Sequence, residues 1–167
     1  MRLRLTYALG LLLAVATLGC AETVMVSVRD ESGFTDEDYR AASRYELTAV
    51  EDGMMGAFFE AGHIVFNLGD YEHFEGSDIQ RRYDVRSAAR EGGASYVVQL
   101  ALVLDGKDES SLRPEQVDYE LWAVDSGERI AAGTRSAPFD FDAPDSERGS
   151  RSAELGRRVA MELLSEW

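Results

Sequence analysis

The stretch AAREGGASYVVQLALVLDG, residues 88–106, marks the clearest boundary between two secondary-structure elements in the chain. Its first residues complete a helical pattern, and Gly92 and Gly93 stand where a helix ends. The run from Ser95 to Leu104 follows at once and is almost entirely apolar. A short apolar run bounded by turn residues is typical of a buried strand. The stretch therefore predicts a helix that leads directly into a strand of an α/β domain.

The flanking sequence predicts further elements on both sides of this stretch. A tight hairpin signal, Asp125-Ser126-Gly127-Glu128, separates two strand-like runs within residues 117–136. The other expected elements are strands at 23–28 and 63–69 and helices at 35–61, 77–91 and 152–167, with charged loop at 105–115. We therefore predict a single layered α/β domain over residues 22–167. It has a mixed five-stranded sheet and three helices in the order β-α-β-α-β-β-β-α.

The expected buried positions follow from helical and strand periodicity. In the first helix Val50, Met54 and Phe58 recur at helical spacing, and Gly53 and Gly56 are expected to allow close packing against the sheet. Alternation in 117–123 separates one buried face from one wetter face. The wetter face carries Asp118, Glu120 and Trp122, and the residues expected inside include Tyr39, Tyr45, Phe58, Phe59, Val117, Tyr119, Leu121, Leu155, Val159 and Leu163.

The first 22 residues, MRLRLTYALGLLLAVATLGCAE, have the order of a bacterial secretory signal: arginines, an apolar run, then small residues. The apolar run is shorter than the roughly 20 residues that cross a bilayer. Cleavage before Cys20, the only cysteine, would make it a lipidated N-terminus, whereas cleavage after Ala21 would remove it. Gly19 fits a lipoprotein signal, but the two positions before it match only in part. We expect a signal peptide at 1–21 and leave lipidation of Cys20 open.

The charge balance restricts the class of partner. The chain has 31 acidic and 17 basic residues, a formal net charge of −14. Such a charge repels phosphate backbones and anionic lipid headgroups. We therefore expect no nucleic-acid partner, and contact with the membrane only through an anchor at Cys20.

Two segments resemble a known group of envelope domains. In AAREGGASYVVQLALVLDG and VDYELWAVDSGERIAAGTRS (residues 117–136), a helix ending in glycine, a strand, a polar loop and an SGE hairpin follow one another. This order resembles the amino-terminal domain of the Tol–Pal translocation protein, the curli-secretion lipoproteins and the penicillin-binding-protein activator lipoproteins. The upstream residues 47–70 fit the same pattern. The resemblance implies a non-enzymatic envelope module that docks to other proteins, and it brings no catalytic residues.

Candidate site residues are few. His63 and His73 lack the spacing of a ligand pair, and no serine lies in a nucleophile elbow. Trp122 is a candidate interface anchor if no helix covers its face. A candidate calcium loop, which lacks the spacing of an EF-hand, comprises Asp140, Asp142, Asp145 and Glu147.

These observations favour an exported accessory protein of a Gram-negative envelope, in the periplasm or anchored at the outer membrane through lipid. It would act by binding other envelope proteins, with neither cofactor nor enzymatic activity. The alternative is a periplasmic binder of a small ligand or divalent cation through the acidic loop 140–147.

Overall fold

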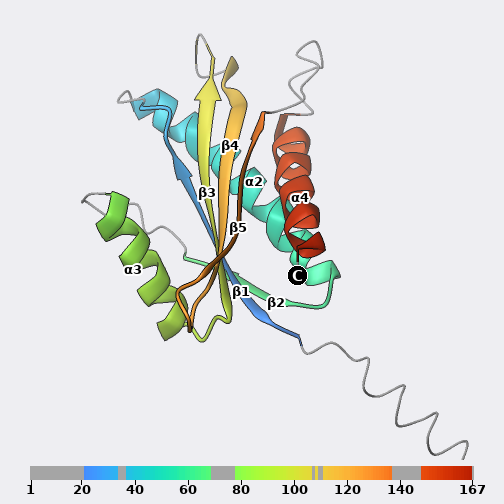
Figure 1. The fold of residues 1–167 in the computed structure, drawn as a ribbon. Helices are drawn as coiled ribbons and strands as arrows, with labels where there is room; N and C mark the ends of the chain where they lie inside the picture. Colours follow the sequence, from blue (N-terminus) through green and yellow to red (C-terminus); the bar gives the residue numbers. More distant parts are fainter. Residues whose placement is uncertain are drawn as a thin grey trace, which may run out of the picture.

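The computed structural model describes residues 21–33, 37–68, 78–106, 108, 111–136 and 148–166. This part of the chain forms one α/β unit (Figure 1). The elements, in chain order, are β1 (Thr23–Asp30), α2 (Glu37–Glu60), β2 (Ile64–Asn67), α3 (Asp78–Glu91), β3 (Tyr96–Asp105), β4 (Arg113–Ala123), β5 (Arg129–Ser136) and α4 (Arg148–Ser165). The predicted α/β order is therefore confirmed.

The five strands form one mixed sheet in the order β2-β1-β3-β4-β5. β1 is parallel to β2 and β3, whereas β4 is antiparallel to both β3 and β5. The chain crosses from β1 to β2 through α2 and then back past β1 to β3 through α3. Because such crossovers are right-handed, these opposite steps place α2 and α3 on opposite faces of the sheet (Figure 1).

The larger core lies between the sheet and the helices α2 and α4. Val50, Met54 and Phe58 of α2 are fully buried there, as the helical spacing predicts. The predicted α4 stripe, Leu155, Val159 and Leu163, is buried too. Each such side chain stabilises the fold by about 1.5–3 kcal/mol when it leaves water. This layer therefore supplies most of the hydrophobic stabilisation.

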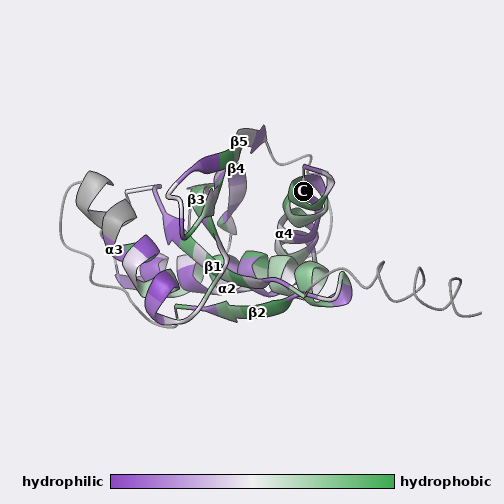
Figure 2. Cartoon of the chain, turned by 60° about the horizontal axis from the view of Figure 1, so that its bottom comes forward, coloured by the Kyte–Doolittle hydropathy of each residue, from purple (hydrophilic) through white to green (hydrophobic). Residues whose placement is uncertain are grey.

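The opposite face of the sheet has a smaller core. There Val85 and Ala89 of α3 pack with Met25, Val97 and Val124. The rest of α3 is mostly hydrophilic, as its colouring in Figure 2 shows. Since α3 has a narrow apolar stripe, it covers only part of this face.

The helices α2 and α4 cross at glycines. A Cβ added at Gly53 would lie 1.9 Å from the carbonyl oxygen of Ala153, and one at Gly156 would lie 1.9 Å from that of Val50. The prediction that Gly53 allows packing against the sheet is thus wrong, because its neighbour is α4. Gly56 was expected to pack in the same way, but a Cβ there would meet no atom within 4 Å.

Two elements begin four residues before the predicted position. β4 begins at Arg113, inside the expected loop, because pairing with β3 continues to Asp105 through a salt bridge of 3.5 Å. Pro114 lies at the register shift, where its missing N–H disturbs the ladder least. α4 begins at Arg148, before the expected Ser152. Within the described residues, no helix is long and apolar enough to cross a membrane.

Candidate interaction surfaces

The β4 strand presents Trp122 on the sheet face that carries α3. Val117, Tyr119 and Leu121 are buried under α2 and α4, and the alternate residues Asp118 and Glu120 share the other face with Trp122. The predicted alternation of β4 is therefore confirmed. Since α3 covers this face only in part, β4 and β5 leave a polar surface around the tryptophan.

The Trp122 indole is half-buried and is held on several sides. It packs against the smaller core, and its Nε1–H donates a hydrogen bond of 3.2 Å to Glu120 Oε2. The guanidinium carbon of Arg86, on α3, lies 4.8 Å from the ring centroid, and that of Arg129, on β5, lies 5.9 Å from it. Guanidinium groups at such distances are attracted to the electron-rich ring face. The ring is therefore fixed in position, with α3 contributing a charged side chain beside it.

The polar groups around Trp122 are joined to one another. Arg129 donates from Nη1 to Glu120 Oε1 at 3.2 Å. Asp118 accepts hydrogen bonds from the Thr134 hydroxyl, at 2.6 Å, and from Gln116 Nε2, at 3.1 Å. On β5 Ala132, Thr134 and Ile130 are exposed. We call Trp122, Arg129, Ile130, Ala132 and Thr134 the tryptophan surface.

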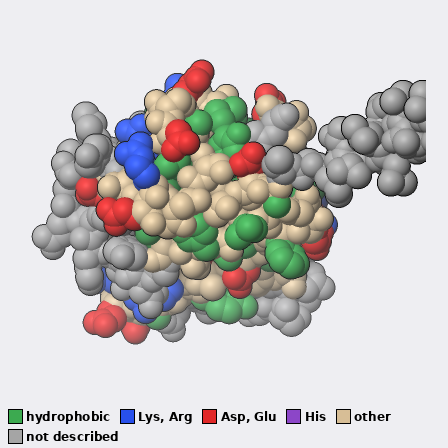
Figure 3. All heavy atoms as spheres, turned by 90° about the horizontal axis from the view of Figure 1, so that it is seen from below, with side chains coloured by type: hydrophobic (Ala, Val, Ile, Leu, Met, Phe, Trp, Pro, Cys, Tyr) green, Lys and Arg blue, Asp and Glu red, His purple; other side chains and the backbone are tan. Residues whose placement is uncertain are grey.

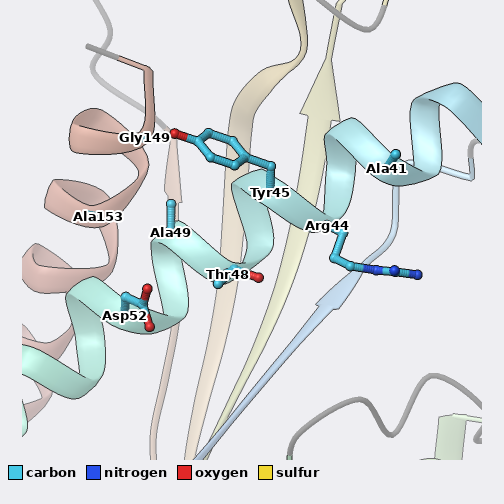
Figure 4. A pocket seen from close by; sticks show the side chains of 8 residues that line it. All are labelled: Ala41, Arg44, Tyr45, Thr48, Ala49, Asp52, Gly149 and Ala153. Carbon is cyan, nitrogen blue, oxygen red and sulfur yellow. The ribbon is translucent and has the colours of Figure 1, made fainter. Parts of the chain in front are cut away.

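A hollow lies between α2 and the amino-terminal part of α4. It has a volume of about 460 Å³, with Ala41, Ala49 and Ala153 among its lining residues. In Figure 4 the Tyr45 ring reaches from α2 toward Gly149 on α4. Arg44 and Asp52 also line it. We call this hollow the α2–α4 groove. Its charged groups lie beside an apolar floor of alanines.

A polar clamp joins α4 to the sheet. The Tyr119 hydroxyl donates to Glu162 Oε1 at 2.7 Å, and Arg135 Nε donates to Glu162 Oε2 at 2.8 Å. The hydrogen bond from Arg135 holds the pKa of Glu162 below its ordinary value, and burial raises the pKa of Tyr119. The clamp therefore holds a charged carboxylate at neutral pH and fastens α4 over β4 and β5.

The candidate residues Cys20, His73, Asp140, Asp142, Asp145 and Glu147 lie outside the described residues. His63 is half-buried, with its ring edge-on to that of Phe58 at 6.2 Å. Within the described ranges, no three His, Cys, Asp or Glu side chains gather closely enough to hold a metal ion. The acidic loop and the lipidation of Cys20 thus stay predictions.

Two aromatic residues were placed wrongly from the sequence. Tyr45 is 59% exposed and Phe59 is 73% exposed, although both were expected inside. Their positions in α2 point away from the face that carries Val50 and Phe58. The exposure of both side chains could have been predicted from helical spacing. The approach of Arg86 and Arg129 to Trp122 could not, because it depends on strand pairing and on the position of α3.

The described residues thus form an α/β domain that carries the tryptophan surface on one face of the sheet and the α2–α4 groove between two helices. No family model matches the sequence, and no curated protein matches it. Among solved structures, the PelC dodecamer from Paraburkholderia phytofirmans is similar at 17% identity and a TM-score of 0.50, over 83% of each chain. At this identity the likeness shows a shared fold.

Two other similar structures are more distant. Lipoprotein GNA1162 from Neisseria meningitidis has 13% identity and a TM-score of 0.49, over 85% of this chain and 99% of that one. The LpoB C-terminal domain from Escherichia coli has 18% identity and a TM-score of 0.33, over 73% and 90%. The predicted resemblance to this group of envelope domains is confirmed as a likeness of fold.

Proposed function

We propose that this chain is an exported accessory protein of a Gram-negative envelope, periplasmic or held at the outer membrane by lipid on Cys20. It binds other envelope proteins and catalyses no reaction. The secretory pattern of residues 1–22 and the fold shared with PelC support this proposal.

The observation that carries the proposal is the fixed position of Trp122 at the edge of the polar sheet face. Tryptophan and arginine are the residue types in which binding energy most often concentrates. Because Arg86 and Arg129 flank the ring, little side-chain entropy is lost when a partner covers it. Ile130, next to Arg129 in β5, is also exposed and apolar. The tryptophan surface is therefore suited to a protein partner.

The carboxylates of this face are suited to recognition. Asp118 and Glu120 each accept two hydrogen bonds from side chains of the same face. Hydrogen bonds of this kind hold a carboxylate in a fixed position. We therefore assign these groups to shaping and charging the tryptophan surface.

Two alanines allow a matched test. Ala132, in the tryptophan surface, and Ala41, in the α2–α4 groove, are both exposed. The tagged protein would be crosslinked in its native cell, and partners identified by mass spectrometry. We expect Ala132→Arg and Trp122→Ala to lose the partner that wild type and Ala41→Arg recover, with all variants folded by circular dichroism. Recovery by Ala132→Arg and loss by Ala41→Arg would move the site to the groove and refute the assignment.

A further inference from the structure

Two exposed apolar side chains lie at the end of the molecule where α2 ends and β2 begins. Phe59 is 73% exposed and Ile64 is 59% exposed. They flank the turn at Gly62, whose positive φ of 93° reverses the chain between helix and strand. Neither side chain belongs to the tryptophan surface or to the α2–α4 groove. We call Phe59 and Ile64 the apolar end patch.

The apolar end patch lies beside the start of the folded chain. The backbone N–H of Ile64 donates to the carbonyl oxygen of Glu22 at 2.9 Å, and Thr23 pairs with Ile64 in the sheet. Only Ala21 and Glu22 separate Cys20 from β1. Two residues span at most about 7 Å. A lipid on Cys20 would therefore enter the bilayer within a short distance of Ile64.

Two glutamates toward this end have side-chain partners, although the protein is strongly acidic. Glu60, next to Phe59, forms a salt bridge of 2.6 Å with Arg157 of α4. Glu51 accepts a hydrogen bond of 3.0 Å from Asn67 of β2, and burial raises the pKa of this carboxyl. Figure 3 views the molecule from below and shows hydrophobic side chains surfacing between scattered acidic and basic groups. This end can thus approach a zwitterionic surface.

We propose that the apolar end patch is a membrane-contact surface, which inserts Phe59 and Ile64 into the interfacial region of the bilayer that anchors Cys20. The proposal rests on the anchoring proposed above. The short connection brings the patch to the bilayer, and removal of the two side chains from water then fixes the orientation of the domain. Each such side chain strengthens partition about tenfold or more when it leaves water.

The single cysteine of the chain makes a direct test possible. Acylation consumes the thiol of Cys20, so Ile64→Cys introduces the only free thiol. Tyr45→Cys is the matched control, because Tyr45 and Ile64 are both 59% exposed. Each acylated protein would be reconstituted in phosphatidylcholine vesicles and treated with a membrane-impermeant maleimide. The same variants carrying Cys20→Ser, free in solution, give the reference rates.

On vesicles we expect the thiol at position 64 to react at least about tenfold more slowly than in solution, and the thiol at position 45 to change less than about twofold. Equal rates at the two positions on vesicles would overturn the proposal. Slow labelling at position 64 in solution that depends on protein concentration would also overturn it, because a second copy would then cover the patch.

A second experiment distinguishes failure of the membrane-contact proposal from failure of the lipid anchoring on which it rests. A wild-type protein without lipid, found by mass spectrometry, would refute the anchoring. Flotation of that protein with phosphatidylcholine vesicles would then test the patch alone. Flotation that is lost in Phe59→Ser/Ile64→Thr and kept in Tyr45→Ser supports the patch, and a wild-type protein that does not float refutes it.

Discussion

Three glycine-to-alanine substitutions in α2 and α4 test the packing of the two helices. At Gly53 the added methyl would lie 1.9 Å from a backbone oxygen of α4, so the helices must separate by about 1.5 Å to reach ordinary contact at 3.4 Å. Overpacking of this kind costs about 1–3 kcal/mol, and a backbone atom cannot rotate away as a side chain does. Alanine returns about 1 kcal/mol of helix propensity. We expect Gly53→Ala to lower the free energy of unfolding by up to about 2 kcal/mol, and Gly156→Ala to behave alike.

Gly56→Ala is the matched control, three residues further along α2. Because no atom lies within 4 Å of its added methyl, only the propensity gain remains, about 0.5–1 kcal/mol of stabilisation. Urea unfolding followed by circular dichroism would measure both changes. In thermal unfolding 1 kcal/mol corresponds to about 2–4 °C for a protein of this size. A Gly53→Ala variant as stable as Gly56→Ala would refute the close crossing of α2 and α4.

Two further predictions concern acid and calcium. Arg135 lowers the pKa of Glu162, so the native state binds fewer protons at this carboxyl than the unfolded state does. The clamp therefore stabilises the native state at neutral pH. This stabilisation is lost as the pH falls below the pKa of an ordinary glutamate and through the lowered pKa of Glu162. In Arg135→Gln the free energy of unfolding should therefore decrease less steeply below about pH 5 than it does in wild type. Arg158→Gln, which removes the exposed pair with Glu154, should leave this pH dependence unchanged. The same pH dependence of unfolding free energy in Arg135→Gln and wild type would contradict the clamp. The proposed protein-binding role predicts no specific calcium site, so millimolar Ca²⁺ should leave the melting temperature nearly unchanged. A calcium site filled at a hundredfold excess over its dissociation constant would add roughly 2.7 kcal/mol, which is enough to raise the melting temperature by more than about 5 °C. Such a rise would support the ion-binding alternative if it vanished when Asn or Gln replaced the acidic residues of the loop, Asp140, Asp142, Asp145 and Glu147.

The order of elements could be predicted because local signals decide it. Gly62, Gly93 and Gly127 all have positive φ at the ends of α2 and α3 and in the β4–β5 hairpin, where the sequence indicates turns. The buried faces of β4 and α4 follow from periods that each segment carries within itself. The order of the strands in the sheet could not be predicted in this way. Which strands become parallel neighbours depends on the crossover connections between them and not on the residues of each strand.

The packing of α2 against α4 could not be predicted from local patterns. Glu46 is 1% exposed, although a glutamate in a surface helix is expected in water. Its carboxylate accepts a hydrogen bond from the Ser152 hydroxyl, which lies more than a hundred residues further along the chain. Gly53 was assigned to the sheet for the same reason. The burial of Glu46 and the close approach at Gly53 both come from a helix–helix contact that neither segment reveals alone.

Only Trp122 of the tryptophan surface was predicted from the sequence, and the fold brings the other residues of the surface to it. Strand alternation placed Trp122 on the correct face, but its arginine neighbours come from α3 and β5. Whether the tryptophan anchors a partner remains a prediction, because its half-buried ring serves the smaller core as well. The α2–α4 groove had no sequence signal apart from the position of Tyr45.

The two proposed surfaces together restrict where a partner binds. Trp122 pairs with Val97, which pairs with Met25, the third residue of β1. At about 3.3 Å per residue, this row lies only about 13 Å along the strand from Ala21. If Cys20 anchors the chain and the apolar end patch meets the bilayer, the tryptophan surface faces sideways close to the membrane. A partner that reaches it must itself lie at the membrane surface, so an accessory protein built in this way would recognise the membrane-proximal part of another envelope protein.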